Sequence, residues 1–280
     1  MGWDVTGDPE KYVAEAGEFL RADPVGNTVP LGIIENLRVQ GADAFGDDPL
    51  FGWWRSADAV RGAFLQTGSF PLVLSALPEE AAAELVVVLA DLGVTLRGVN
   101  GSAPAARAFA TGWQERTGVA AQVLMRQRLF RLDRLAMPDP LPEGGWRLAT
   151  AADHDLVHAW FVAFEEEAGG VGGVSSRLIR DRIGYGGVLL WEAGGPPVSL
   201  AGRTRVASGM CRIGPVYTPV EHRQRGYGAA VTAVLTREAL SAGADHVVLF
   251  TDVANPTSNA IYQRLGYRPT DDRLVLGFVP

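Results

Sequence analysis

The segment Arg-Gln-Arg-Gly-Tyr-Gly-Ala, residues 223–229, decides the fold of this chain. It lies between a strand-like run that ends at Tyr217 and a helix-forming apolar run that begins at Gly226. The N-terminus of a helix leaves backbone N–H groups without partners and carries partial positive charge. Glycines let the backbone approach a ligand closely, and Arg223 and Arg225 add positive charge at the same place. The segment therefore predicts an anion site suited to a pyrophosphate.

Two other kinds of glycine-rich phosphate-binding turn fit this segment less well. A dinucleotide-binding turn requires a third glycine, and Val231 stands in its place. A nucleoside-triphosphate loop requires Gly-Lys followed by Ser or Thr, which the chain lacks. On this segment alone, a tight turn without a ligand stays open.

The elements predicted around the segment form a mixed α/β unit over residues 145–280. Their order is strand, helix, helix, three strands, helix, strand, helix and strand, or βααβββαβαβ. The predicted ranges are 146–149, 151–168, 175–183, 188–192, 197–205, 209–217, 226–242, 246–252, 256–265 and 268–278. A glycine-rich break at 169–173 separates the first two helices.

A second motif follows at residues 255–267, which read Asn-Pro-Thr-Ser-Asn-Ala-Ile-Tyr-Gln-Arg-Leu-Gly-Tyr. Asn255 and Pro256 are favoured at the N-cap and the first position of a helix. Tyr262 then lies two turns from the cap on the same face. The glycine segment, this motif and the element order together resemble the GNAT superfamily of N-acetyltransferases over residues 145–280. The resemblance implies acetyl-CoA as co-substrate and no metal.

The resemblance also implies where acetyl-CoA lies, namely between the fourth and fifth strands of the unit. Its pyrophosphate would contact the glycine segment, Arg223, Gln224, Arg225, Gly226, Tyr227, Gly228 and Ala229. Its pantetheine amides would pair with the backbone of Val216, Tyr217 and Thr218, as another strand would. Pro215 and Pro219 bracket these residues, and proline favours a sheet edge or a bulge.

Acetyl transfer to an amine requires a neutral amine, a stabilised oxyanion and a proton for the leaving thiolate. The resemblance implies that Tyr262 is the acid, that Asn255 bonds the pantetheine arm, and that transfer is direct in a ternary complex. A packing role for Tyr262, like that of Tyr267, is the alternative. Asn259 lies one turn from both motif residues, so it could face the ligand or bond the preceding loop.

The sequence assigns no general base. The strand at 209–217 has no carboxylate, whereas many members of the family have a glutamate there. Candidates elsewhere are His158, Glu165, Glu166, Glu167 and Asp252. A solvated helix end and deprotonation through water both stay open. The lone Cys211 is interpreted as a buried strand residue rather than a nucleophile.

The first half of the chain repeats the end of this element order. The predicted ranges are a strand at 71–77, a helix at 79–92, a strand at 94–99, a helix at 103–115 and a strand at 122–132. In place of the glycine segment it has Ala-Leu-Pro-Glu-Glu at 76–80, where Glu79 and Glu80 would repel a pyrophosphate. Its second helix carries Phe109 and Trp113 and no Asn-to-Tyr pair.

We therefore predict a degenerate acetyltransferase-like domain at 1–136 and a catalytic domain at 145–280. A proline-rich segment at 137–144 is predicted to join them. The apolar cluster of 51–54 with Phe64 is interpreted as core, with a role in lining a substrate pocket as the alternative.

Composition limits the function class. A chain of 280 residues has room for two domains, and its net charge of −7 argues against a dedicated nucleic-acid binder. Its longest apolar runs fall far short of the roughly 20 residues of a membrane helix. The mixed, acidic N-terminus lacks a signal-peptide pattern, and one cysteine excludes an internal disulfide, so a cytoplasmic location is predicted.

The predicted substrate is a primary amine of a small molecule, an amino-acid derivative or a peptide. A non-catalytic acyl-CoA-binding or protein-interaction module is the alternative. The oligomeric state stays open.

Overall fold

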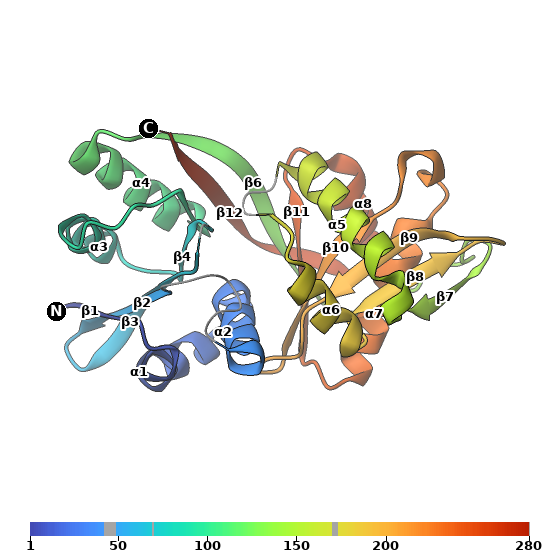
Figure 1. The fold of residues 1–280 in the computed structure, drawn as a ribbon, viewed down its shortest axis with the longest axis horizontal. Coiled ribbons are helices and arrows are strands. Elements are labelled where there is room, and N and C mark those ends of the chain that lie inside the picture. Colours follow the sequence, from blue (N-terminus) through green and yellow to red (C-terminus); the bar gives the residue numbers. More distant parts are fainter. Residues whose placement is uncertain (42–48, 69, 170–172, 280) are drawn as a thin grey trace. The chain divides into compact units, whose positions relative to one another are not determined.

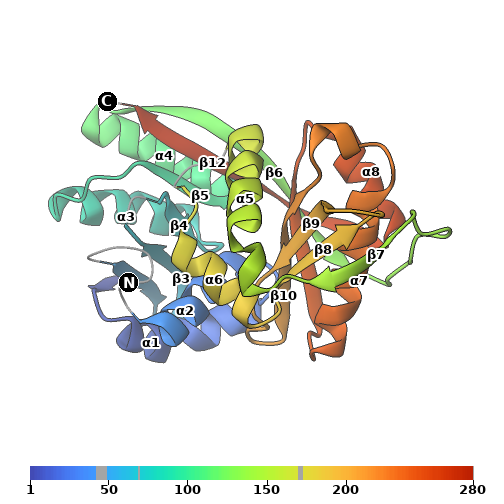
Figure 2. The same cartoon turned by 45° about the vertical axis from the view of Figure 1, so that its right-hand side comes forward.

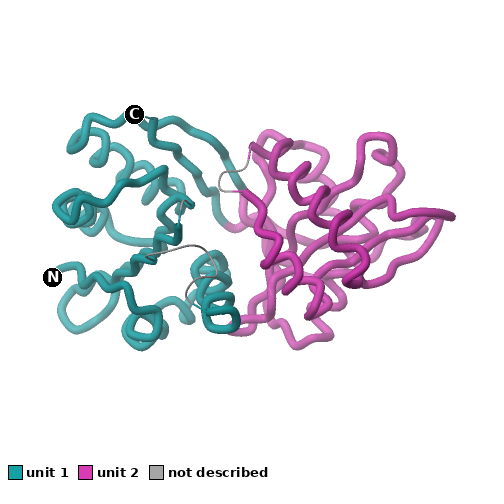
Figure 3. Tube along the Cα trace, viewed as in Figure 1, with its two compact units in different colours: residues 1–127, 271–280 teal, residues 128–270 magenta. Residues whose placement is uncertain are grey.

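The computed structural model describes residues 1–41, 49–68, 70–169 and 173–279. The chain forms two compact units (Figure 3). Unit 1 comprises Met1–Gln127 with Asp271–Pro280, and unit 2 comprises Arg128–Thr270. The sequence-based division at 137–144 is linear along the chain, whereas unit 1 also takes in the C-terminal end. The glycine break predicted at 169–173 lies partly at 170–172, outside the described residues.

The second half of the chain has the predicted order βααβββαβαβ (Figure 1). Its elements are β7 (Gly145–Leu148), α5 (His154–Ala168), α6 (Ser176–Gly184), β8 (Val188–Glu192), β9 (Pro197–Arg203), β10 (Met210–Tyr217), α7 (Tyr227–Ser241), β11 (His246–Asp252), α8 (Pro256–Arg264) and β12 (Tyr267–Val279). Short 3-10 turns at Ala151–Asp153 and Val220–His222 precede α5 and α7. The predicted mixed α/β class is confirmed.

The first half has the same order in full, not only the five elements at its end that the sequence predicts. Its elements are β1 (Gly2–Thr6), α1 (Pro9–Ala22), α2 (Thr28–Gln40), β2 (Leu50–Ser56), β3 (Ala59–Gln66), β4 (Leu72–Leu74), α3 (Glu79–Asp91), β5 (Gly98–Ser102), α4 (Ala103–Thr117) and β6 (Ala120–Leu132). Each half is thus a complete βααβββαβαβ pattern.

The strand predicted at 94–99 is wrong in its position, because β5 begins only at Gly98. Gly93 has a φ of +68° and follows the end of α3, and the Val94 N–H bonds Leu89 O at 3.1 Å to close that helix. Residues 94–97 therefore serve as the helix-to-strand connection. The real strand, with two glycines and an asparagine in five residues, has little intrinsic strand propensity.

The strand order shows that β6 and β12 run through both units. Within unit 1 the order is β1-β2-β3-β4-β5-β12-β6, and within unit 2 it is β12-β6-β11-β10-β9-β8-β7. In unit 1, β12 pairs antiparallel with β5 from Arg273 opposite Ser102 to Gly277 opposite Gly98. In unit 2, Phe130 of β6 is fully buried in the main core. Each unit therefore includes a strand segment from the other half of the sequence.

In unit 2 the helices cover both faces of the sheet (Figures 1 and 2). Alternate residues of β8 point to opposite faces, as the pleat requires. Leu189 and Trp191 pack in the core with α7 and α8, whereas Val188 and Leu190 pack in the core with α5 and α6. The predicted linker also packs here, since Trp191 Nε1 donates to Glu143 O at 3.0 Å.

In unit 1 the aromatic cluster of residues 51–54 with Phe64 lies in the core, as interpreted from the sequence. Phe51, Trp53, Trp54 and Phe64 are all 2% exposed or less. The Trp54 indole donates to Glu84 Oε2 at 2.8 Å, which satisfies its buried N–H. Across the described parts of the chain, no helix has the length and apolar character to cross a membrane.

Candidate active site

Strands β10 and β11 run together and then part. They pair in parallel only as far as Ile213 and Leu249. Beyond that point β10 pairs with β9 alone, through Val216 and Tyr217. The register with β9 shifts between Ile213 and Val216, so the irregularity includes Pro215, where the sequence predicts a sheet edge or a bulge. The end of β10 therefore presents an edge toward β11 that has no partner strand in the described chain.

The glycine segment forms the start of α7. Gly226 is the N-cap residue with a φ of +85°, a conformation that side chains with a Cβ rarely adopt. No side chain caps the helix, and the first helical bond runs from Ala230 N–H to Gly226 O at 3.0 Å. The preceding N–H groups of the first turn are therefore available to an anion.

Gly228 brings this helix start to the unpaired end of β10. A Cβ built on Gly228 would lie 3.6 Å from Thr218 Oγ1 and 4.0 Å from Val216 Cγ1. Thr218 itself is held by a hydrogen bond of 2.8 Å between its hydroxyl and that of Ser199. The predicted pyrophosphate and pantetheine residues are thus neighbours in space.

The two arginines of the segment have different surroundings. Arg225 is exposed and makes no hydrogen bond or ion pair with a described residue. Arg223 donates Nε to Thr218 O at 2.8 Å, and its Nη2 contacts both carboxylate oxygens of Glu167 at 2.8 and 2.7 Å. Both partners of this pair are more than 40% exposed, so it contributes about 1 kcal/mol or less. Arg223 is positioned against β10, and Arg225 can turn toward an anion.

Tyr262 differs from its neighbour Tyr267 in the state of its hydroxyl. Both rings are buried, and they meet edge to face with centroids 6.3 Å apart. The Tyr267 hydroxyl bonds Thr236 Oγ1 at 2.6 Å, whereas the Tyr262 hydroxyl has no partner among the described residues. Burial raises the pKa of Tyr262 to about 12, so the phenol keeps its proton at neutral pH. An unbonded, protonated hydroxyl is able to donate.

Comparisons with known proteins bear on the fold. A family model described as FR47-like protein matches residues 197–276. The chain is similar to a Drosophila protein of known structure (TM-score 0.72, 17% identity, covering 99% of this chain and 98% of that one). It is similar to a GCN5-related N-acetyltransferase from Sphaerobacter thermophilus (TM-score 0.62, 15% identity, 99% and 95%). A tandem GNAT protein from the clavulanic acid biosynthesis pathway also matches (TM-score 0.57, 13% identity, 99% and 98%).

The chain has a tandem GNAT fold. The resemblance predicted from the glycine segment is confirmed, and so is its extension to the first half. No curated protein matches the sequence. The GNAT fold supports acyl transfer, but a fold hosts many activities, so function has to be argued from the site.

Asn255 and Asn259 both hold the start of α8 in this fold. Asn255 Oδ1 accepts from Ser258 N at 3.0 Å, which makes it the predicted N-cap. Asn259 Nδ2 donates to the backbone oxygens of Asp252 at 3.0 Å and of Asn255 at 2.7 Å. Of its two expected roles, Asn259 thus shows the contact with the preceding loop. Its Oδ1 is buried without a partner, and contact with a ligand stays a prediction.

The candidate bases lie in unlike environments. Glu165 is partly buried with no partner in the described chain, and burial raises the pKa of its carboxyl. Glu166 is exposed, and Glu167 is paired with Arg223. Asp252 Oδ1 accepts from Ala254 N at 2.8 Å and so stabilises its own loop.

The two remaining candidate residues are His158 and Cys211. The ring centroids of His158 and His154 lie 6.1 Å apart. Cys211 is buried, its thiol donates to Thr204 O at 3.3 Å, and burial raises the pKa of that thiol. Cys211 thus has the environment of a structural strand residue. Within the described ranges, no three His, Cys, Asp or Glu residues are grouped to hold a metal ion.

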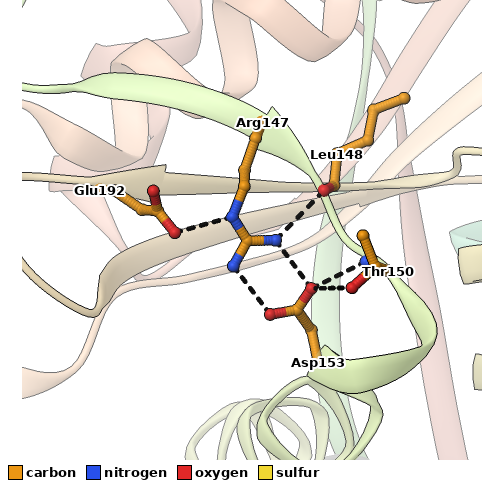
Figure 4. Close-up of polar contacts among 5 residues, drawn as sticks. All are labelled: Arg147, Leu148, Thr150, Asp153 and Glu192. Carbon is orange, nitrogen blue, oxygen red and sulfur yellow. Dashed lines mark hydrogen bonds and ion pairs between the residues drawn. The ribbon is translucent and has the colours of Figure 1, made fainter.

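The start of α5, which carries several of these candidates, is fixed by an ion-pair cluster (Figure 4). Arg147 contacts both oxygens of Asp153 at 2.7 and 2.8 Å and reaches Glu192 Oε1 at 2.7 Å. Asp153 also accepts from the N–H and hydroxyl of Thr150, completing a capping box. Arg147 holds the pKa of the Asp153 carboxyl well below its usual range. A cavity of about 490 Å³ lies at this end of α5, whereas the Glu167 contact is at the other end.

Sequence reasoning missed two contacts at the site. One is the Arg223–Glu167 pair, whose members are 56 residues apart. The other is the bond of 3.0 Å from Arg182 Nη1 to Gly214 O in the β10 bulge, across 32 residues. Neither leaves a local pattern, because both depend on how α5 and α6 lie over the sheet.

Proposed function

We propose that this protein is an N-acetyltransferase that uses acetyl-CoA and has one active site, in unit 2. The observation that carries the proposal is the meeting of two features at Gly228, the unpaired edge of β10 and the uncapped start of α7. A strand edge without a partner offers backbone groups to an amide-bearing arm, and a helix start offers N–H groups to phosphates. A ligand that joins a pyrophosphate to an amide-bearing arm fits both.

The residues have separate roles in binding. The N–H groups from Gly226 to Ala229 and the guanidinium of Arg225 would hold the pyrophosphate. The backbone of Val216, Tyr217 and Thr218 would pair with the arm. Since its Oδ1 caps α8, Asn255 would contribute its amide nitrogen. When bound, acetyl-CoA supplies the thioester whose carbonyl carbon accepts the amine.

Tyr262 is the proposed acid. As the new C–N bond forms and the C–S bond breaks, the Tyr262 hydroxyl gives its proton to the departing sulfur. The proton that the amine loses passes to water or to Glu165, the one candidate carboxylate that is both partly buried and unpartnered. Transfer is then direct, with both substrates held in one complex.

The missing carboxylate in β10 favours the second candidate function, a non-catalytic acyl-CoA-binding or protein-interaction module. A single assay separates the two. We expect thiol release from acetyl-CoA in the presence of primary amines, with acetylated amine detected by mass spectrometry. Binding of acetyl-CoA without any thiol release across a broad amine panel would favour the module.

A matched pair of glycine variants tests the site. Gly228→Leu places a side chain between Val216 and Thr218, so we expect loss of thiol release. Gly195→Leu is the control, because a Cβ on Gly195 meets no atom within 4 Å. Equal activity of Gly228→Leu and wild type would overturn the proposed site. A cytoplasmic location and the absence of nucleic-acid and membrane partners stay predictions.

A further inference from the structure

Three arginines gather beside Tyr185, in the connection between α6 and β8. The Arg205 guanidinium lies 4.1 Å from the Tyr185 ring centroid and that of Arg203 lies 5.6 Å from it. Arg182, on α6, packs over the ring of Phe161 at 5.3 Å. The Tyr185 hydroxyl donates to Arg203 O at 2.7 Å. Burial raises the pKa of Tyr185, and the charges of all three arginines act in the opposite direction.

This arginine cluster, Arg182, Arg203 and Arg205, is short of negative charge. Asp181 pairs with Arg205, and the two side chains are 23% and 21% exposed. Arg182 and Arg203 have no carboxylate partner in the described chain. Arg182 donates to Gly214 O, and Arg203 donates to Thr204 O and also contacts the buried Cys211 thiol. Three cations therefore face one carboxylate.

The cluster is also short of hydrogen-bond acceptors. The Nε atoms of Arg203 and Arg205 are buried without a partner. Partly buried cations that lack partners are unfavourable, and arginine forms strong two-point hydrogen bonds with planar anions. In a chain with a net charge of −7, such a local excess of positive charge indicates a ligand that brings its own anion.

Arg182 links the cluster to the proposed acyl site. Its Nη1 donates to Gly214 O at 3.0 Å, and a Cβ built on Gly202 would lie 3.1 Å from the same nitrogen. Gly214 is two residues before Val216, the first residue proposed to pair with the pantetheine arm. Two residues of extended chain span at most about 7 Å. A small acceptor can therefore reach both places.

We propose that the arginine cluster binds a carboxylate of the amine acceptor, so that the substrates are amines that also carry a carboxylate. This inference rests on the proposed acetyltransferase function and names its substrate class. A net charge of −7 is compatible with cationic substrates, whereas the surroundings of this site are cationic and favour an acceptor that carries an anion. The anion fixes one end of the acceptor, and the amine is thereby oriented toward the acyl donor.

The test uses the standard amino acids as probes, each as the free acid and as its carboxamide, with the full-length protein. We expect the free acids to be acetylated with a kcat/KM at least tenfold above that of the carboxamides. Calorimetry in the presence of CoA is expected to detect binding of the acids. Equal turnover of acids and carboxamides, or no binding of any acid, would overturn the proposal.

Variants of the arginine cluster test whether it binds the carboxylate. Arg203→Gln is expected to raise the KM for the acids about tenfold or more, with kcat and the KM for carboxamides nearly unchanged. Arg203→Lys keeps the charge and is expected to restore part of the affinity. Arg180→Gln, an exposed change on α6, is the control and is expected to match wild type. Arg203→Gln with the KM of wild type would contradict the assignment.

The same measurements distinguish this inference from the proposed function. If an acid binds through the cluster but no thiol is released, the acetyltransferase proposal fails and the carboxylate site stands. If thiol is released equally with acids, carboxamides and polyamines, the acetyltransferase stands and the carboxylate site fails. An amine with a phosphonate in place of the carboxylate distinguishes the two anions, and we expect it to bind less well than the acid. Tighter binding of the phosphonate would contradict the choice of a carboxylate.

Discussion

The helix that follows the fourth strand has opposite electrostatic character in the two halves of the molecule. In the second half, α7 starts at Gly226 without a side-chain cap and with no acidic residue in its first turn. In the first half, α3 starts after Pro78, and its first turn carries Glu79 and Glu80. Carboxylates at a helix start interact favourably with the helix dipole and repel an external anion. The same fold is thus open to a phosphate in one half and closed to it in the other.

The strands that precede these helices differ in the same sense. Beyond Ile213, β10 and β11 no longer pair. In the first half β4 pairs with β5 at Leu72 and Val73. The next residue, Leu74, is fully buried and lies beside Gly101, whose built Cβ would be 3.2 Å from Leu74 Cβ. The end of β4 is thus buried at Leu74, whereas the end of β10 is only partly buried at Val216 and Tyr217. We therefore expect the ligand chemistry to depend on the second half alone, while folding depends on both.

The largest expected effect comes from removing the first half. A fragment of residues 145–280 loses the β6 residues 128–132, including Phe130, which is fully buried in the unit 2 core. Deletion of a buried phenylalanine side chain typically costs about 3–5 kcal/mol. The fragment also leaves Asp271–Val279 without β5. We expect it to be poorly soluble or inactive, as measured by size-exclusion chromatography and thiol release.

A soluble, monomeric 145–280 fragment with full turnover would break the claim that both halves are needed for folding. A fragment of residues 128–280 is the informative comparison, because it restores Phe130. We expect it to be more soluble than 145–280, and equal behaviour of the two would argue against a role for β6.

The next effect concerns Tyr262, for which α4 in the first half has no equivalent tyrosine. We expect Tyr262→Phe to slow transfer on the order of 10²–10⁴-fold, the usual contribution of a proton donor, with CoA affinity within a few-fold of wild type. Single-turnover kinetics measure the rate. Tyr267→Phe is the control, since it removes the bond to Thr236 and should lower stability without a comparable loss of rate. An unchanged rate in Tyr262→Phe would make that tyrosine a packing residue.

A smaller effect is expected from freeing Arg223. Glu167→Gln weakens the ion pair that holds this guanidinium, so we expect acetyl-CoA to bind more tightly, by about fivefold or less for an exposed pair. Glu166→Gln, an exposed neighbour without that pair, is the control. Calorimetry measures both. Weaker binding in Glu167→Gln would show that the pair supports the site instead of competing with the ligand.

The smallest effect concerns stability and pH at Glu165. Burial raises the pKa of this carboxyl in the folded state, so the folded protein holds its proton to higher pH than the unfolded chain. The stability contributed by this group is present below the unfolded pKa of about 4.3 and falls as pH rises through the folded pKa. We expect Glu165→Gln to raise Tm slightly at pH 7 and to leave it unchanged at pH 4. An equal Tm for wild type and variant at pH 7 would contradict this.

Local sequence signals account for most of the second half. The apolar periodicity, the N-cap at Asn255 and the glycine segment predict its ten elements within a few residues. The start of the first half carries weaker signals, and its elements before residue 71 are not predicted, although Asp8 and Pro9 are residues that favour a helix start and Asp8 caps α1 in the structure. The predicted position of the glycine-containing strand β5 is wrong because its pairing with β12, and not its own composition, makes it a strand.

Long-range pairing is what the sequence does not reveal. The shared strands β6 and β12 depend on which of several strands closes each sheet, and no local pattern encodes that choice. The same holds at the site. The glycine segment is readable because its chemistry is local, whereas the arginine cluster forms only when α6 and the end of β9 come together.

The stoichiometry of acetyl-CoA binding tests the central contrast most directly. Isothermal titration calorimetry on the full chain is expected to give one equivalent per chain, with Gly228→Leu abolishing it. Replacing both Glu79 and Glu80 with glutamine is expected to leave the stoichiometry at one, because packing at Leu74 still closes the first half. Two equivalents in wild type, or one that survives Gly228→Leu, would contradict the account.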